Sequence, residues 1–144
     1  MADMCRLLSS LPSGAEERPA LRHALAVRAA AVDNNYHELF SQLLPCTPNL
    51  GKCILDTMLP EWRYEALKRI VRAYTPVTVS RSFVLSELGF DPHQPNSRKQ
   101  GGRYLRLTGC VCTGAGEDAV LQTKETVLRP FKDEDDEHEL FVQV

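Results

Sequence analysis

The sequence lacks the short motifs that mark most enzyme active sites. It contains no G-x-S-x-G nucleophile motif, no H-E-x-x-H zinc motif and no phosphate-binding P-loop. None of its four histidines stands at metal-ligand spacing from another histidine or a cysteine on one helical face. The acidic residues cluster late in the chain, where mutually repelling carboxylates are poorly placed for acid–base work. We therefore expect no catalysis, no cofactor and no metal. An enzyme of unknown type stays as the last of three hypotheses, after the two that are given below.

Cysteine pairs and long apolar runs are also missing. The five cysteines, an odd number, include no C-x-x-C pair. Cys110 and Cys112 stand too close together for a disulfide within one strand and are too few for a zinc site. This usage predicts free, mostly buried thiols in a reducing compartment. No apolar run is long enough to cross a bilayer, and the N-terminal stretch lacks the hydrophobic region of a secretory signal.

What remains is the composition of an ordinary globular protein. The 144 residues are 43% hydrophobic and 25% charged, which predicts one compact domain or two small subdomains sharing a core. The formal net charge is −2, so contact with nucleic acid requires a local basic patch rather than the field of the whole molecule.

The first sixty residues have the periodicity of short helices joined by tight turns. Apolar residues from Met4 to Leu11 recur at spacings of three and four, which predicts a short amphipathic helix. Thr47 is expected to cap a later helix, with Pro48 at its first position. Short turns favour antiparallel neighbours, as in the helical hairpins of an α-solenoid. The longer helices are expected at residues 19–33, 36–44 and 48–58.

A different order of elements follows Pro60. A helix, a short β-branched strand, two more helices and a hairpin form the order of a winged helix. The last of these helices is expected to be weak, because Gly101 and Gly102 each cost about 1 kcal/mol relative to alanine. Gly89 is expected to end the preceding helix in a left-handed conformation. The expected elements are helices at 60–74, 80–89 and 98–107, a strand at 77–79, and a hairpin of strands at 110–113 and 119–127.

These patterns predict a mainly α fold: α-solenoid-like helical hairpins followed by a winged helix with a small antiparallel β wing. We assign the helical hairpins to residues 1–60, the winged helix to residues 61–130 and an acidic tail to residues 131–144. Five consecutive carboxylates, 133–137, lie in that tail, which is expected to be solvated.

Basic residues gather on the helix that occupies the recognition position of a winged helix. Lys99, Arg103 and Arg106 fall on one face at helical spacing, whereas Arg98 lies off that face. Several cations on one surface are what phosphate contacts require, and the absence of an Asn/Gln cluster favours backbone contact without sequence specificity. The predicted nucleic-acid-binding residues are Arg98, Lys99, Arg103, Arg106 and Lys124.

Several segments resemble the Sac/GANP domain, which belongs to the PCI class of scaffold subunits. The alanine-rich helix and the asparagine- and phenylalanine-containing stretch after it carry the first part of the resemblance. The elements that come next match that domain in the same order and with similar gaps. The match is good over residues 19–90 and weak over the wing. The matching segments are Ala24–Ala30, Asn34–Phe40, Arg63–Lys68, Ala73–Tyr74 and Val84–Phe90.

The resemblance implies a non-enzymatic scaffold in a nuclear complex that couples transcription to mRNA export. It implies docking of a second PCI-type subunit through the winged helices, association with a small acidic peptide subunit, contact with RNA or DNA, and no membrane. Localisation is expected to be nuclear, with cytoplasmic or centrosomal pools and a cell-division role as alternatives. The expected partner-binding residues are Phe83, Val84, Leu88 and Val120.

The chain resembles only the C-terminal half of that domain. The upstream helices of the full domain have no counterpart, so the face that carries Leu21 and Leu25 is expected to be exposed. A stand-alone winged helix that binds nucleic acid is the second hypothesis beside the scaffold.

Overall fold

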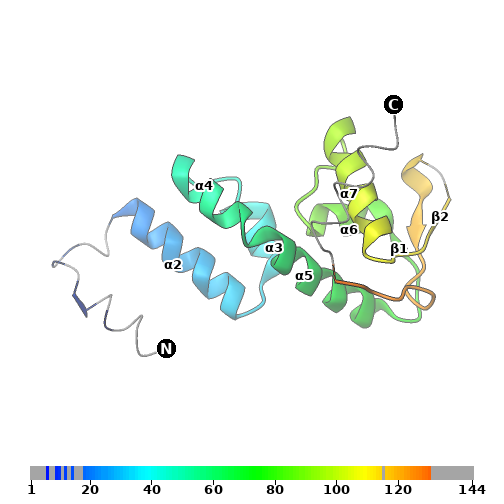
Figure 1. Ribbon diagram of the computed structural model, residues 1–144, viewed down its shortest axis with the longest axis horizontal. Helices are drawn as coiled ribbons and strands as arrows, with labels where there is room; N and C mark the ends of the chain where they lie inside the picture. Colours follow the sequence, from blue (N-terminus) through cyan, green and yellow to red (C-terminus); the bar gives the residue numbers. More distant parts are fainter. Residues whose placement is uncertain are drawn as a thin grey trace.

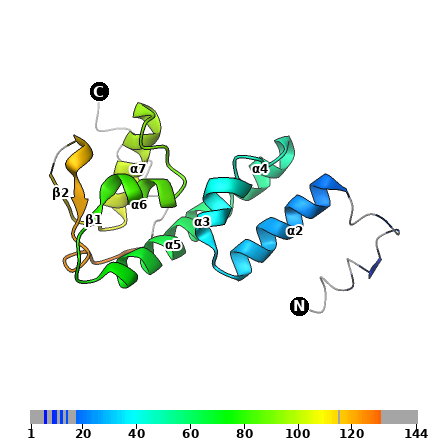
Figure 2. The same ribbon diagram turned by 180° about the vertical axis from the view of Figure 1, so that it is seen from behind.

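The protein is an elongated molecule in which two groups of elements share one long helix (Figure 1). The computed structural model describes Arg6, Ser9, Ser10, Pro12, Gly14 and residues 18–114 and 116–130. The predicted helix at Met4–Leu11 falls largely outside the described residues, and the predicted acidic tail falls wholly outside them. The trunk, which we define as α2 to α4, lies at one end, and the wing module, α6 to β3, lies at the other. Helix α5 joins them, as the reverse view also shows (Figure 2).

The first two predicted helices are present in the trunk, and the second of them changes from an α-helix to a π-helix. Helix α2 (Pro19–Val32) begins at a proline in its first turn, and Asn34 ends the segment with a φ of 58°. The Asn35 side chain accepts a hydrogen bond from the Glu38 amide and caps α3 (Tyr36–Glu38). The helix then widens into the π-helical turn η2 (Leu39–Leu43), which apolar periodicity does not distinguish from an α-helix.

The predicted cap of the next helix is wrong. Helix α4 (Asn49–Asp56) has Pro48 at its N-cap position, so Thr47 stands outside the helix. The Thr47 hydroxyl instead donates to the Leu43 carbonyl at 3.0 Å and lies 3.0 Å from Nε2 of His23 on α2. It therefore fixes the turn between η2 and α4 rather than starting α4.

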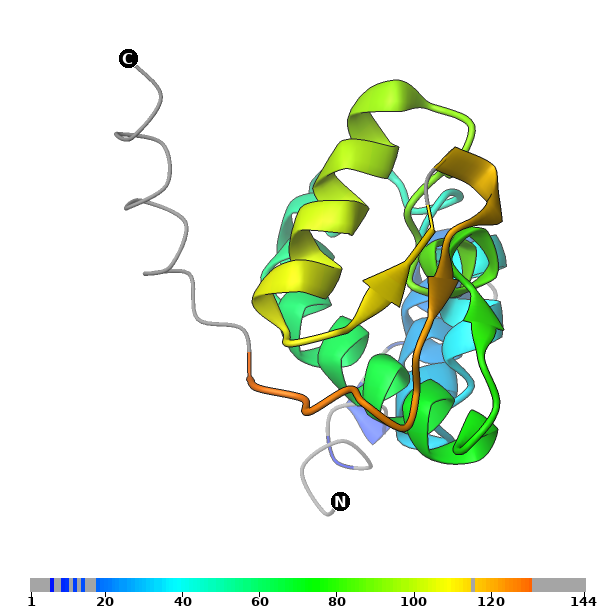
Figure 3. The same cartoon turned by 90° about the vertical axis from the view of Figure 1, so that its right-hand side faces the viewer.

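The wing module has the element order that the sequence predicts. After α5 (Leu59–Tyr74) come β1 (Val79–Ser80), α6 (Arg81–Glu87), α7 (Pro95–Leu107), β2 (Cys112–Thr113), the short 3₁₀ turn η3 (Gly116–Asp118) and β3 (Val120–Leu121). The strands pair antiparallel in the order β1-β3-β2, with Leu121 opposite both Val79 and Cys112 (Figure 3). The mainly α fold with a small antiparallel wing is thus confirmed, with shorter strands than expected.

Helix α7 is longer and better formed than predicted. It begins at Pro95 rather than at residue 98, and Gly101 and Gly102 lie inside it without a break. Both glycines lie where α7 crosses α6. A Cβ added at Gly101 would lie 2.5 Å from Cδ2 of Leu85, and one at Gly102 would collide with the Arg81 guanidinium. The glycines therefore permit the close approach of the two helices.

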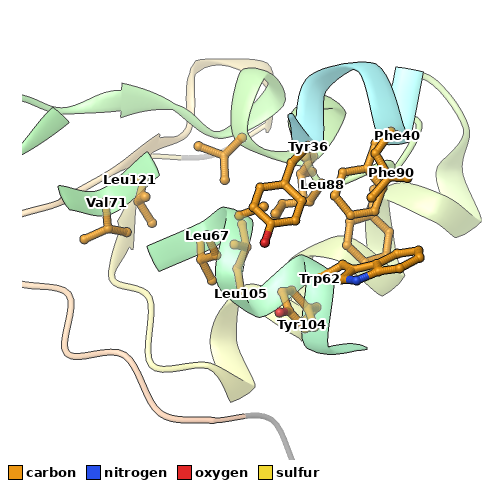
Figure 4. Close-up of a cluster of buried hydrophobic side chains, with 14 of the residues drawn as sticks. Tyr36, Phe40, Trp62, Leu67, Val71, Leu88, Phe90, Tyr104, Leu105 and Leu121 are labelled. Atoms are coloured by element: carbon orange, nitrogen blue, oxygen red, sulfur yellow. The ribbon is translucent and has the colours of Figure 1, made fainter. Parts of the chain in front are cut away.

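One continuous core connects the trunk to the wing module (Figure 4). It contains Val27 of α2, the α5 residues Trp62 and Leu67, and Leu121 of β3. Helix α5 contributes buried residues along its length, so the core crosses the predicted domain boundary between residues 60 and 61. Within the described ranges, no helix is long and apolar enough to cross a membrane.

Candidate functional site

A basic face, which we define as Lys99, Arg103 and Arg106, runs along α7. Lys99 and Arg106 are exposed and Arg103 is half-buried. They follow one another at spacings of four and three residues, so they share one side of the helix. Residues 92–116 contain no carboxylate, so no acidic side chain of α7 itself neutralises this face. The structure thus brings three of the five predicted nucleic-acid-binding residues together.

The other two predicted residues lie elsewhere. Arg98 is half-buried and lines a different cleft with Arg81 and His93. This position agrees with the expectation that Arg98 lies off the common face. Lys124 is exposed on the segment that follows β3.

A cleft of about 330 Å³ lies between α5 and α7 and adds a cation that the sequence did not indicate. Arg103 of the basic face lines this cleft, and so does Arg63 of α5. The Arg63 guanidinium lies 4.1 Å from the centre of the Phe90 ring, and its Nε donates to the Leu88 carbonyl at 3.0 Å. Arg63 is forty residues from Arg103, so only the helix packing reveals the pair.

The electrostatics of the cleft suit an anion rather than proton transfer. Burial lowers the pKa of Arg63, although nearby Tyr104 and Asp56 oppose this shift, and arginine stays protonated at neutral pH. Burial raises the pKa of the Tyr104 phenol, so this group is neutral at physiological pH. Two guanidinium groups and a neutral phenol can hold a phosphate or carboxylate.

A wing patch, which we define as Tyr74, Val77 and Phe83, exposes apolar side chains at the C-terminal end of α5, in the turn that follows it and on α6. Their exposed fractions are 41%, 62% and 39%. The rings of Tyr74 and Phe83 meet edge to face with centroids 6.0 Å apart. An exposed aromatic–aliphatic surface of this kind is typical of protein-docking sites.

The predicted partner-binding residues divide between this patch and the core. Phe83 is exposed on the wing patch, and Val120 is half-buried in β3. Val84 and Leu88 are wholly buried in the core, so their assignment to partner contact is wrong. Apolar residues of one helix follow the same spacing whether they face a core or a partner, which explains the error.

A second apolar surface lies on the trunk. The trunk groove, which we define as the space between α2 and α4, contains two adjoining hollows of about 290 and 430 Å³. Ile54 of α4 and Val32 of α2 are 65% and 58% exposed there. Leu21 and Leu25, which were expected to be exposed, are half-buried.

The cysteines are free but less buried than predicted. Among the described residues, Cys46, Cys53 and Cys112 are exposed and Cys110 is half-buried. Burial raises the pKa of the Cys110 thiol to about 11, partly opposed by its hydrogen bond with Thr108. The described part of the chain also contains no cluster of three or more His, Cys, Asp or Glu side chains that could hold a metal.

Cys110 should therefore be alkylated about 20-fold more slowly than an ordinary cysteine thiol in a short peptide at pH 8. An ordinary thiol is about one quarter ionised at this pH, and a thiol with a pKa of about 11 is about one-thousandth ionised. The higher intrinsic nucleophilicity of the more basic thiolate recovers about tenfold of that difference. Iodoacetamide labelling followed by peptide mass spectrometry gives both rates. The Cys110 rate should keep rising about tenfold per pH unit up to pH 10, and equal rates at pH 8 would contradict the prediction.

Comparison with known proteins places the chain in a family. The model of the SAC3/GANP family matches residues 1–96. The chain belongs to the SAC3/GANP family. The SAC3/GANP match ends in the first turn of α7, so the basic face lies beyond it.

Two relatives extend the SAC3/GANP comparison. SAC3 family protein A of Arabidopsis thaliana is 31% identical over 140 residues, covering 89% of this chain and 14% of that protein. A THP3 homolog of Schizosaccharomyces pombe is 29% identical over 90 residues, covering 62% of this chain and 22% of that protein. The chain thus spans less than a quarter of either relative's length. No solved structure matches it.

Proposed function

We propose that this SAC3/GANP chain is a non-enzymatic scaffold module that acts in the nucleus in transcription-coupled mRNA export. It docks a second PCI-type subunit on the wing patch and contributes backbone contacts to RNA or DNA through the basic face. The wing patch carries the proposal, because it exposes an aromatic pair on a structured element rather than on a loop. Family membership supports the setting in mRNA export.

The geometry of the wing patch supports docking of a folded partner. Tyr74 and Phe83 already hold each other edge to face, so little side-chain freedom is lost when a partner covers them. Val77 is exposed in the turn that follows α5, where its amide donates to the Tyr74 carbonyl. Large, pre-organised aromatic side chains of this kind dominate the binding energy of protein interfaces.

Phe83→Asp should weaken binding of the PCI-type partner by at least tenfold. The substitution places a charge within the wing patch, at a side chain that is 39% exposed and does not belong to the buried core. The matched control is Leu50→Asp on α4, where an 81% exposed leucine receives the same charge at the other end of the molecule. Partner affinity is measured by biolayer interferometry with the recombinant PCI-type subunit. If Leu50→Asp abolishes binding and Phe83→Asp does not, the partner docks on the trunk.

The double variant Arg103→Gln/Arg106→Gln should bind nucleic acid about tenfold more weakly at 50 mM salt. Two fewer phosphate contacts should also lower the slope of log affinity against log salt by about 2 for duplex DNA. The control Arg22→Gln/Arg28→Gln removes the same charge from exposed positions on α2. Fluorescence polarisation with a labelled duplex and a single-stranded RNA measures the affinity and its dependence on salt. An equal loss in the control would show that net charge, not the basic face, governs binding.

A stand-alone nucleic-acid-binding protein is the second candidate. The run of 25 residues without a carboxylate around α7, 92–116, favours it. The two candidates differ in their need for a partner. In the second, Phe83→Asp leaves nucleic-acid affinity and cellular function unchanged, whereas in the scaffold it separates the chain from its complex.

A further inference from the structure

Charge is strongly segregated along this chain. Residues 131–144 hold six of the nineteen acidic side chains and one of the seventeen basic ones, so their formal charge is −5. The chain as a whole carries −2, so the preceding residues carry +3. Helix α7 contributes four cations and no carboxylate to that excess. The sequence thus joins an acidic segment to a chain whose helix α7 carries basic residues and no acidic ones.

The acidic segment begins close to the end of α7. After β3 the chain passes the C-terminal end of this helix, where the Arg129 amide donates to the Thr108 carbonyl at 2.9 Å (Figure 3). The Val127 carbonyl also lies against Gly109, at a place where a Cβ would collide with it. Pro130, the last described residue, therefore leaves the fold near Thr108, two residues beyond Arg106 of the basic face.

The distances allow the acidic segment to cover the whole basic face. Asp133 lies three positions after Pro130, a span of at most about 10 Å. Lys99 and Arg106 are seven residues apart on the helix, which corresponds to about 10 Å along its axis. The seven residues 133–139 span up to about 24 Å when extended. The segment is thus long enough to lie along all three cations without stretching.

We propose that residues 133–139 fold back onto the basic face of α7 within the same chain. Carboxylates contact Lys99, Arg103 and Arg106, and the segment imitates the phosphates of a nucleic acid. A tether this short gives an effective concentration in the millimolar range, so individually weak ion pairs suffice to populate the docked state. The docking itself stands apart from the proposed function, whereas its consequence, competition with nucleic acid, rests on it.

Zero-length carbodiimide coupling tests the docking without nucleic acid. This reagent joins a lysine amine to a carboxylate only where the two are in direct contact. In the full-length chain at low salt, Lys99 should couple to carboxylates of residues 133–139. The variant Arg106→Lys should add a second coupling site nearer to Pro130. The ion pair between Lys68 and Glu65, with its 2.6 Å contact, is an internal standard for the reaction.

Matched controls make the coupling result decisive. Arg22→Lys places the same amine on exposed α2 at the opposite end of the molecule and should not couple to the acidic segment. Couplings to Lys99 should disappear at 0.5 M salt, where screening acts within a few ångströms. Docking is overturned if Lys68 couples to Glu65 while neither Lys99 nor Arg106→Lys couples to the segment. It is also overturned if mixing isotope-labelled and unlabelled chains shows that the couplings form between molecules.

A binding measurement tests the competition separately. Neutralising the six carboxylates to Asn or Gln should raise affinity for a labelled RNA about tenfold at 50 mM salt, with the difference fading by 0.3 M. Unchanged affinity in a chain that binds RNA overturns the competition. If the couplings form but neither chain binds RNA or DNA, the nucleic-acid part of the proposed function fails while the docking stands.

Discussion

Trp62→Ala is expected to lower the free energy of unfolding by about 3–5 kcal/mol. Trp62 is 8% exposed on α5, where it belongs to the core and also forms part of the floor of the trunk groove. In Figure 4 its indole lies on the same side of the core as Phe40 of η2 and Phe90 of the α6–α7 loop. Removing it opens a cavity at the place where the trunk and the wing module meet.

Urea denaturation followed by far-ultraviolet circular dichroism is the appropriate measurement. Trp62 is the single tryptophan of the chain, so its fluorescence is lost with the substitution. With a slope of about 2 kcal/mol per molar urea, the midpoint should fall by about 2 M. Tyr74→Ala is the matched control, because it removes a 41% exposed aromatic from the same helix and should cost about 1 kcal/mol. A Trp62→Ala loss no larger than that of Tyr74→Ala would contradict the assignment.

The order of elements could be predicted from the sequence because local signals set it. Proline in the first turn, Asn34 in a left-handed conformation and Gly89 with a φ of 75° mark boundaries that depend on a few neighbouring residues. The cap at Thr47 failed because a second local partner was available. Its hydroxyl donates to the carbonyl of Leu43, four residues earlier, and therefore does not cap the first turn of α4.

The candidate site was only partly predictable, since tertiary packing completes it. Helical spacing alone placed Lys99, Arg103 and Arg106 on one face. The addition of Arg63 depends on α5 packing beside α7, and the wing patch depends on Tyr74 meeting Phe83. Val84 and Leu88 show an error that spacing alone produces. Spacing identifies an apolar face of a helix but not whether the core or a partner covers that face.

Gly101 shows how packing can reverse a prediction from propensity. As an isolated helical residue, glycine costs about 1 kcal/mol relative to alanine, so Gly101→Ala would be stabilising. In the fold, an added Cβ lies 2.5 Å from Leu85 and 2.9 Å from Phe90, and both neighbours are buried. Moving two packed side chains costs about 3 kcal/mol, at the upper end for an overpacked core. The gain in propensity offsets about one third of that cost.

Gly101→Ala is therefore expected to lower the free energy of unfolding by about 2 kcal/mol. Gly102→Ala is the control from the next position of the same helix, with the same gain in propensity. Its new Cβ meets only the far end of the Arg81 side chain, which can move, so the propensity gain remains and the free energy of unfolding should be unchanged or rise by up to about 1 kcal/mol. Urea midpoints of the two variants give the comparison directly. Equal effects at the two positions would mean that α7 does not approach α6 as closely as the packing of Leu85 and Phe90 requires.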